Sequence, residues 1–357
     1  MPRKKNQEGS TMSFRENETT QKGAGGRGQR LRVLLTIALA ATLSLSLLAG
    51  CQPKTTEPTT DPVAEEEVER VPVGPVTFTD DLGYEITVED PERVVATMGS
   101  LGKIWELAGG TLIGISDDVD TYSGYALSSL EVARVGDFTS IDLEKVLALE
   151  PDFVILTAVS TGRGGTANQL DFKETLEASG ITVAYFEVTT FQDYLRMLNY
   201  CTQITGRSDL FRENGADVKS KIETYLSLVP ANEHPSVLLI TTYSGGSQGL
   251  NSSTQTGSML SFLGAKNMTD ANPSLLSTVS LEAIIEANPD FIFVQPRGVT
   301  ADEAVKILQE FTDHPAWSEL DAVKNGNFIV LDSPLFLYKP LERWDEAYTL
   351  LFGYLYA

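Results

Sequence analysis

The stretch Leu143–Leu156, LEKVLALEPDFVIL, recurs as Leu281–Val294, LEAIIEANPDFIFV. Leu, Glu, Pro, Asp and Phe are identical at equivalent positions of the two copies. In each copy, apolar residues at helical spacing precede a Pro-Asp break and a run of β-branched and aromatic residues. Each copy therefore predicts a helix followed by a buried parallel strand. The repeat predicts a duplicated α/β chain of two similar lobes, with a ligand cleft between the lobes.

The duplication extends beyond this stretch. In the first half, a helical pattern and Gly109 precede a predicted strand at Leu112–Ile115. In the second half, Met259–Leu263, Gly264 and Lys266–Met268 repeat this order of helix, glycine and strand. Such alternation of helices and strands is typical of parallel α/β sheets, so we expect two Rossmann-like lobes.

A long helical pattern lies between the two halves. It runs from Phe191 to about Ile204 and again over Ser208–Val229, with apolar residues near 3.6-residue spacing. Gly206 and Pro230 punctuate the pattern. It predicts a single stiff helix that joins the lobes and permits only a small change in the angle between them.

The N-terminus has the layout of a signal peptide. Three arginines between residues 27 and 32 precede an apolar run, Val33–Leu48, that is short and rich in Ser and Thr for a membrane span. The run ends in Leu-Ala-Gly-Cys at Cys51, which matches the bacterial lipobox. We expect residues 1–50 to be removed and Cys51 to carry lipid, which would anchor the protein to the outer face of the cell membrane. A plain secretory signal is the alternative.

The remaining chain divides into four predicted parts. Residues 51–75 are rich in Thr, Pro and Glu and have no apolar periodicity, so they predict a solvated tether. Val76–Glu89 alternates like a β-hairpin and opens the folded part. We predict the first lobe at residues 76–206, the interlobe helix at 207–230 and the second lobe at 231–357.

The charge of the chain excludes some partners. It carries 27 Lys and Arg against 49 Asp and Glu, a net charge of −22. Residues 1–50 contain eight of the basic and three of the acidic residues, so the remainder has 19 and 46, a net charge of −27. This balance argues against nucleic acid and anionic lipid as partners. Cys201 lies in a helical pattern, and we expect it to be buried and to form no disulfide.

Together these features resemble a known family. The lipobox, the hairpin followed by PERVV, the LEKVLALEPD and LEAIIEANPD segments, the joining helix and the closing HPAWSELDAVKNGNFIVLD are similar to the substrate-binding lipoproteins of ABC importers. The resemblance is to the class with a rigid interlobe helix, which delivers ferric siderophores, haem or vitamin B12. It spans Thr77–Ala357. It implies a monomer that performs no catalysis, with a membrane permease dimer and its cytoplasmic ATPase as partners.

The resemblance also implies docking residues. In the family, acidic residues on the lobe tips pair with arginines of the permease, and Glu144 and Glu282 match them. With one carboxylate on each lobe, binding to the permease depends on the distance between the lobes. Arginine binds carboxylates in a bidentate manner. The alternative is that each glutamate only complements the dipole of its helix.

Ligand-binding candidates follow predicted strands, because ligands of open α/β sheets bind beyond the carboxyl ends of strands. Aromatic planes and fixed cations suit a large, flat or anionic chelate. By the resemblance, Phe138 lies where the vitamin B12-binding relative has an aromatic residue in its cleft. Arg163 lies where that relative has a comparable Arg-Gly-Gly sequence after a strand. The candidates are Ser100, Tyr122, Tyr125, Phe138 and Arg163 in the first lobe, and Tyr243, Gln295, Arg297, Tyr338, Lys339, Arg343 and Trp344 in the second.

Four of these candidates are cations in an otherwise acidic chain: Arg163, Arg297, Lys339 and Arg343. They favour an anionic iron chelate, with a ferric siderophore as first choice, unless they pair with neighbouring acids at the surface. Vitamin B12 remains an alternative, as does haem, for which Tyr338 could serve as axial ligand. No His and carboxylate cluster has the spacing of a metal site, so we expect neither a free metal ion as cargo nor a cofactor.

An enzyme is the alternative of another class. Residues 245–249, GGSQG, fit the G-x-S-x-G motif, with Asp290 or Asp302 and then His314 in the chain order of an α/β-hydrolase triad. This reading predicts a secreted esterase with Ser247 as nucleophile. The motif requires a helix at the nucleophile, whereas Leu250–Gln255 is a polar stretch, so we predict a binding protein. An adhesin or sensor with the same fold is a third class.

Overall fold

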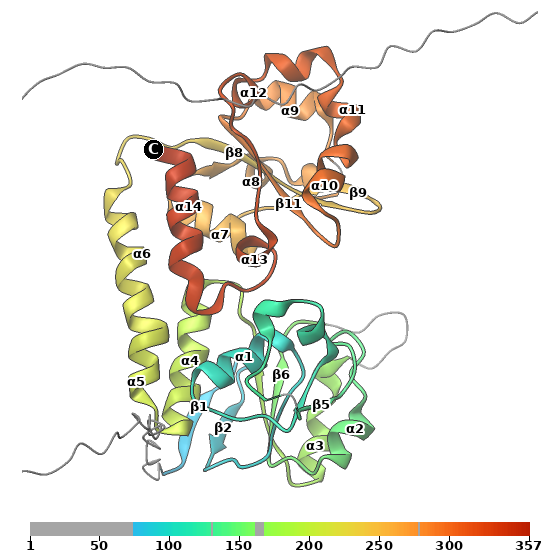
Figure 1. Cartoon of the computed structure of the whole chain (residues 1–357), viewed down its shortest axis with the longest axis vertical. Helices are drawn as coiled ribbons and strands as arrows, with labels where there is room; N and C mark the ends of the chain where they lie inside the picture. The colour runs from blue at the N-terminus through green and yellow to red at the C-terminus, as the bar shows by residue number, and fades with distance from the viewer. Residues whose placement is uncertain (1–73, 130, 161–167, 278) are drawn as a thin grey trace, which may run out of the picture. The chain divides into compact units, whose positions relative to one another are not determined.

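The structure is a computed structural model that describes residues 74–129, 131–160, 168–277 and 279–357 (Figure 1). The predicted signal peptide, most of the tether, Cys51 and Arg163 lie outside these residues. None of the helices in the described ranges is both long and apolar enough to cross a bilayer.

The first lobe is built on a five-stranded parallel sheet. Its strand order is β5-β4-β3-β6-β7. The strands are β3 (Val94–Ala96), β4 (Gly114–Ile115), β5 (Ala133–Arg134), β6 (Phe153–Thr157) and β7 (Thr182–Phe186). The helices are α1 (Gly99–Leu107), α2 (Leu143–Ala148), α3 (Lys173–Ala178) and α4 (Phe191–Thr205). The predicted hairpin is confirmed as antiparallel β1 (Val76–Thr79) and β2 (Glu85–Val88).

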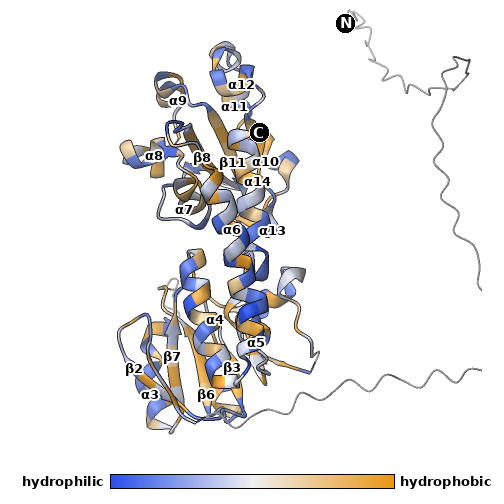
Figure 2. Ribbon diagram, turned by 90° about the vertical axis from the view of Figure 1, so that its left-hand side faces the viewer, coloured by the Kyte–Doolittle hydropathy of each residue, from blue (hydrophilic) through white to orange (hydrophobic). Residues whose placement is uncertain are grey.

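The second lobe has a similar sheet. Parallel strands follow the order β10-β8-β11-β12, and β9 pairs with β8 in the antiparallel sense. The strands are β8 (Ser236–Tyr243), β9 (Gly246–Gly249), β10 (Lys266–Asn267), β11 (Phe291–Pro296) and β12 (Phe328–Val330). The helices are α7 (Gln255–Phe262), α8 (Met268–Ala271), α9 (Leu281–Ala287), α10 (Ala301–Ile307), α11 (Gln309–Thr312), α12 (Asp321–Lys324), α13 (Ser333–Phe336) and α14 (Trp344–Tyr356). Strands β8 and β11 consist mainly of hydrophobic residues, whereas the helices contain both hydrophobic and hydrophilic residues (Figure 2).

The repeated stretch has the same conformation in both lobes, as predicted. A helix, α2 or α9, precedes a parallel strand, β6 or β11. At the end of each helix, one residue adopts the left-handed conformation: Glu150, with φ of 46°, and Asn288, with φ of 39°. Left-handed backbone followed by proline cannot continue a helix, which explains why both helices stop at this point.

The repeated Pro-Asp pair also has a structural function. The carboxylate of Asp152 accepts the backbone N–H of Arg93 at 3.0 Å, at the start of β3. In the second lobe the carboxylate of Asp290 accepts the backbone N–H of Ser236 at 2.7 Å, at the start of β8. Each aspartate therefore fixes the register between its own strand and the central neighbour.

The interlobe helix is continuous but not uniform. It consists of α5 (Ser208–Phe211), a π-helical turn at Arg212–Ala216 and α6 (Asp217–Leu228). The predicted joining helix is therefore present, and it departs from regular α-helical geometry at this turn. The hydroxyl of buried Tyr194 donates to the Asn214 carbonyl at 2.8 Å, and the Asn214 amide donates to the Leu107 carbonyl at 2.9 Å. A π turn leaves a backbone carbonyl without its usual hydrogen bond within the helix. Here the Asn214 carbonyl accepts a hydrogen bond from Tyr194 of the first lobe instead.

The two ends of the interlobe helix contact different lobes. The π turn is bonded to α1 and α4, as described above. Lys221 of α6 forms an ion pair of 2.9 Å with Asp345 at the start of α14. On α4, Cys201 is buried as predicted, and burial raises the pKa of its thiol.

Candidate functional site

Each sheet has one point where its strand order reverses. In the first lobe, successive strands are added on one side of β3 and then on the other, so β3 and β6 flank the switch point. In the second lobe, β8 and β11 flank the equivalent point. The crevice beyond the carboxyl ends of such strands is where open α/β sheets bind ligands.

The first-lobe crevice is organised by Gln169, which the sequence analysis did not identify. Its amide nitrogen donates to the carbonyls of Phe138 at 2.7 Å and Thr97 at 3.2 Å. Its amide oxygen accepts the N–H of Thr157 at 3.1 Å and the hydroxyl of Thr97 at 2.5 Å. Gln169 is almost fully buried and joins the loops after β3, β5 and β6. Glutamine is usually a surface residue, so nothing in the local pattern indicates this function.

The second-lobe crevice has a comparable buried network. The hydroxyl of Thr256 lies 3.0 Å from both the Gln295 amide oxygen and the Phe336 carbonyl. The amide of Gln255 donates to the Tyr338 carbonyl at 2.8 Å. Gln295 is buried, so the structure places this predicted ligand contact in a network that holds the segment after α13.

Three predicted ligand residues, Tyr122, Tyr125 and Tyr338, contact one another across the lobes, and we call them the tyrosine clasp. The rings of Tyr122 and Tyr338 stack, with centroids 4.0 Å apart and planes 3° apart. Tyr125 meets them edge on at 4.8 and 6.0 Å. The Tyr125 hydroxyl accepts the backbone N–H of Lys339 at 2.7 Å, and the Tyr122 hydroxyl donates to the Pro334 carbonyl at 3.3 Å.

Two predicted cations remain without an acidic partner among the described residues. Arg297 follows β11 and is exposed, with its guanidinium carbon 4.7 Å from the centre of the Tyr243 ring. Lys339 is half-buried beside the clasp. Burial lowers the pKa of the Lys339 ammonium to about 8, although Asp193 and Glu187 act in the opposite direction.

Three other predicted contacts are corrected by the structure. Trp344 is fully buried and lies 5.9 Å from the Phe191 ring, so it is a core residue with no surface for a ligand. Ser100 is also fully buried, in the first turn of α1. Arg343 forms an ion pair of 2.7 Å with Glu346, so its charge is already balanced.

The remaining first-lobe candidate, Phe138, is half-buried in the loop after β5. The second lobe contributes a cavity of about 370 Å³ beyond the carboxyl ends of β11 and β12. Its walls include Pro296, Thr300, Asp332 and Ser333. The predicted aromatic and polar groups therefore gather at the expected edge of each sheet, although several of them are covered.

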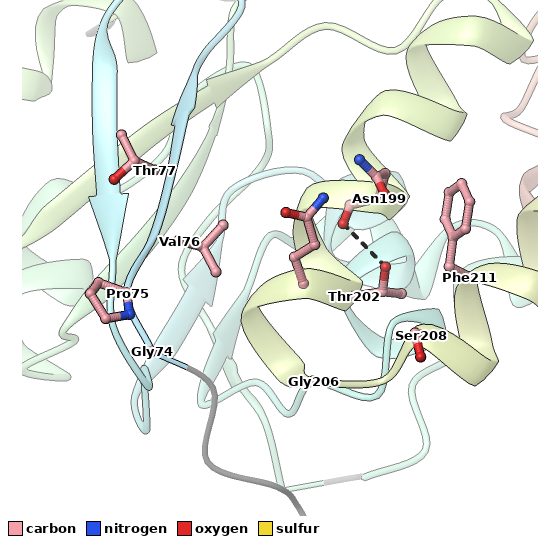
Figure 3. A pocket seen from close by; sticks show the side chains of 10 residues that line it. Gly74, Pro75, Val76, Thr77, Asn199, Thr202, Gly206, Ser208 and Phe211 are labelled. Atoms are coloured by element: carbon pink, nitrogen blue, oxygen red, sulfur yellow. Dashed lines mark hydrogen bonds between the residues drawn. The ribbon is translucent and has the colours of Figure 1, made fainter.

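A larger cavity, of about 560 Å³, lies elsewhere (Figure 3). It is lined by the start of β1 and by Asn199 and Thr202 of α4, where Thr202 donates to the Asn199 carbonyl at 3.1 Å. Among the described residues that line this cavity, none lies at the carboxyl end of a strand, so we do not assign the ligand to it.

Glu144 and Glu282 occupy equivalent, exposed positions. Each lies in the first turn of its helix, α2 or α9. The side chains of Asp142 and Ser280 cap these helices by accepting N–H groups at 3.2 Å. Other residues therefore cap these helices, and within the described part of the chain neither glutamate carboxylate forms an ion pair.

The hydrolase motif does not form a catalytic site. Ser247 lies within β9, opposite Thr242 of β8, so a hairpin replaces the required strand, turn and helix. The Asp290 carboxylate is bonded to Ser236, and His314 accepts the N–H of Ala316 at 3.2 Å. The Asp290 carboxylate and the His314 Nδ1 are therefore engaged in local hydrogen bonds.

Two parallel α/β lobes, a joining helix and a cavity at the carboxyl strand ends of the second lobe are the features of two-lobed binding proteins. The sequence profile of the periplasmic binding protein family matches residues 94–335, and the chain belongs to this family. Proteins of this family deliver metal chelates to ABC permeases. The chain is therefore a substrate-binding protein for import and not an enzyme.

Individual relatives agree with this assignment. The chain is 27% identical over 251 residues to the Fe(3+)-citrate-binding protein YfmC of Bacillus subtilis, covering 69% of this chain and 75% of the relative. It is 24% identical over 310 residues to the ferric-anguibactin-binding protein FatB of Vibrio anguillarum, covering 84% and 90%. A periplasmic binding protein from Veillonella parvula has the same fold, with a TM-score of 0.64 and 18% identity over 79% of this chain and 92% of the other.

Proposed function

We propose that this protein is lipid-anchored through Cys51 on the outer face of the cell membrane, captures an anionic ferric chelate and delivers it to a permease dimer driven by a cytoplasmic ATPase. A ferric siderophore is the proposed cargo. Relatives named for ferric citrate and ferric anguibactin support this choice of cargo class.

One observation carries the choice of an anionic cargo. In a chain of net charge −22, Arg297, directly after β11, and Lys339, after α13, have no carboxylate partner among the described residues. An unpaired cation that is half-buried, as Lys339 is, is costly unless a ligand supplies the opposite charge, and exposed Arg297 is open to a ligand from solvent. Arginine and lysine donors bind the carboxylate or catecholate oxygens of such a ligand with charge-assisted hydrogen bonds.

The test is a binding titration of the full-length protein by calorimetry. The ligands are a ferric tris-catecholate, ferric citrate, haem and cobalamin. We expect the ferric chelates to bind, and replacement of both Arg297 and Lys339 by alanine to weaken binding by about 100-fold, from roughly 1.5 kcal/mol for each charged contact.

The matched control removes two other cations that already have partners. Lys219 of α6 pairs with Glu223, and Lys324 of α12 pairs with Glu319, and neither lysine lies at the carboxyl end of a strand. Their double alanine variant has the same change in net charge and should bind like the wild type. Equal losses of affinity in both double variants would show that binding depends only on the net charge of the protein. Exclusive binding of haem or cobalamin would replace the proposed cargo.

We further propose that Glu144 and Glu282 dock the two lobes on the permease. Their equivalent, exposed positions on α2 and α9 support this role. A pair of carboxylates, one on each lobe, suits arginine side chains on the two permease subunits.

A further inference from the structure

The interlobe helix changes its partner lobe at the π turn. Within the turn, Gly215 is buried against α4, where an added Cβ atom would lie 3.1 Å from the Leu198 side chain. Beyond the turn, the Tyr225 ring of α6 lies 5.5 Å from the Phe352 ring of α14. The helix therefore packs on the first lobe at the π turn and on the second lobe beyond it.

The contacts beside this helix leave one motion open. The Phe191 ring of the first lobe packs on Trp344 of the second, with ring centroids 5.9 Å apart. This contact lies next to the helix, because Asp345, the neighbour of Trp344, pairs with Lys221 of α6. Helices bend at π turns. The helix and this contact therefore form one edge of the seam between the lobes, about which the lobes can turn.

The tyrosine clasp joins the lobes away from that edge. Its second-lobe segment follows α13, which lies on the side of α14 away from α6 (Figure 1). Here the Tyr122 hydroxyl donates across the seam to the Pro334 carbonyl at 3.3 Å. The Lys339 N–H donates to the Tyr125 hydroxyl at 2.7 Å, and the Tyr338 ring stacks on Tyr122. Two bodies that are joined along one edge and at a separate point cannot turn about that edge.

Each half of the clasp is also fixed to its own lobe. In the second lobe, the buried Gln255 amide donates to the Tyr338 carbonyl at 2.8 Å. In the first lobe, Tyr125 is only 5% exposed, and its N–H donates to the Tyr122 carbonyl at 2.9 Å. Contacts between rings weaken steeply as the rings separate. A shift of one lobe therefore breaks the clasp, because neither half can follow the other lobe.

We propose that the tyrosine clasp holds the two lobes in one relative position in the cargo-free protein, so that the crevice and the spacing of the docking glutamates are set before cargo binds. Tyr122, Tyr125 and Tyr338 are positioning residues in this arrangement, because they act through the placement of the lobes and need not touch cargo. The effect on cargo affinity rests on the proposed function, whereas the effect on the placement of the lobes does not.

Loss of the clasp has a consequence for affinity. The lobes then turn about the π turn, and cargo binds only those molecules in which the lobes are correctly placed. The apparent affinity falls in proportion to the fraction of such molecules. If about one molecule in ten has the correct placement, binding weakens by about tenfold. Saturating cargo shifts the population back to that placement.

The first experiment measures the distance between the lobes by electron paramagnetic resonance in the cargo-free, full-length protein. Spin labels at Glu174→Cys of α3 and Lys306→Cys of α10 report on one lobe each, and both positions are exposed. Cys51→Ser removes the second native thiol, and Cys201 is buried. This labelled protein is the parent for the variants.

The clasp variant is Tyr122→Ala with Tyr338→Ala. The matched control is Tyr84→Ala with Tyr354→Ala, which also removes one tyrosine from each lobe, at exposed positions outside the clasp. We expect the parent and the control to give one narrow distance distribution and the clasp variant to give a broad one. Tyr122→Leu, which keeps an apolar side chain but loses the stack and the hydroxyl, should also broaden the distribution.

Calorimetric titration with a ferric tris-catecholate completes the test. We expect the clasp variant to bind about tenfold more weakly than the parent and the control, and saturating chelate to restore its narrow distribution. If the cargo-free distribution of the clasp variant is as narrow as that of the parent, the inference is overturned. Tighter binding by the clasp variant also overturns it, because the clasp would then obstruct cargo. If the parent binds no ferric chelate but the clasp variant broadens, the proposed function fails and the clasp still places the lobes.

Discussion

Replacing Gln169 with leucine should destabilise the protein strongly, although the two side chains are similar in size. In the wild type, the Gln169 amide makes hydrogen bonds of 2.5 to 3.2 Å to Thr97, Thr157 and Phe138. Leucine offers no polar atom in return. The Thr157 N–H and the Thr97 carbonyl then lose a partner in a region that solvent does not reach, since both residues are fully buried, whereas the Thr97 hydroxyl can still donate to the Ile155 carbonyl at 3.2 Å.

The magnitude follows from those two groups. An unsatisfied buried polar group costs about 1 to 3 kcal/mol, and the two groups together cost about 4 kcal/mol. Burial of the apolar leucine side chain returns about 1 kcal/mol. The free energy of unfolding should therefore fall by about 3 kcal/mol.

Urea denaturation of the full-length protein measures this change. The control is Gln203→Leu, because Gln203 is exposed on α4, and a surface substitution should change the free energy of unfolding by less than about 0.5 kcal/mol. If the Gln169 and Gln203 variants are equally stable, the buried network is not a stabilising element. The account of how the first-lobe crevice is held would then be wrong.

Three further predictions concern other parts of the chain. Replacement of both Glu144 and Glu282 by alanine should abolish stimulation of the permease ATPase and leave cargo affinity unchanged. Alanine at exposed Glu174 is the control and should change neither property. Full stimulation of the ATPase by the double variant would refute the docking proposal. Cys51→Ser should prevent incorporation of labelled palmitate, and labelling that persists would contradict the lipid anchor. The Cys201 thiol should not react with a thiol reagent until the protein unfolds, because burial raises its pKa and blocks access; rapid reaction in the native state would contradict its burial.

Much of the fold was predictable because its signals are local. The helix and strand periodicities of Leu143–Leu156 and Leu281–Val294 predicted matching elements in two lobes, and both pairs formed. The interlobe helix was predicted for the same reason. Its π turn was not, because the turn depends on Tyr194 and Leu107, which lie far from Asn214 in the sequence.

The candidate site was less predictable. Residue type and position after a strand selected Arg297 and Lys339, but the same criteria selected Trp344, which packs in the core. The tyrosines of the clasp were selected as ligand contacts, whereas they contact one another. Local sequence does not reveal whether an aromatic side chain meets solvent, a ligand or another lobe.

The amino-acid sequence alone determined that this protein has two related α/β lobes joined by a helix, because hydrophobic periodicity acts over a few turns or strand residues. Tertiary structure alone decided which polar groups are buried, which cations lack a partner and which aromatic rings meet across the seam. Those properties depend on contacts such as Tyr122 with Tyr338, whose residues are brought together only when both lobes have folded.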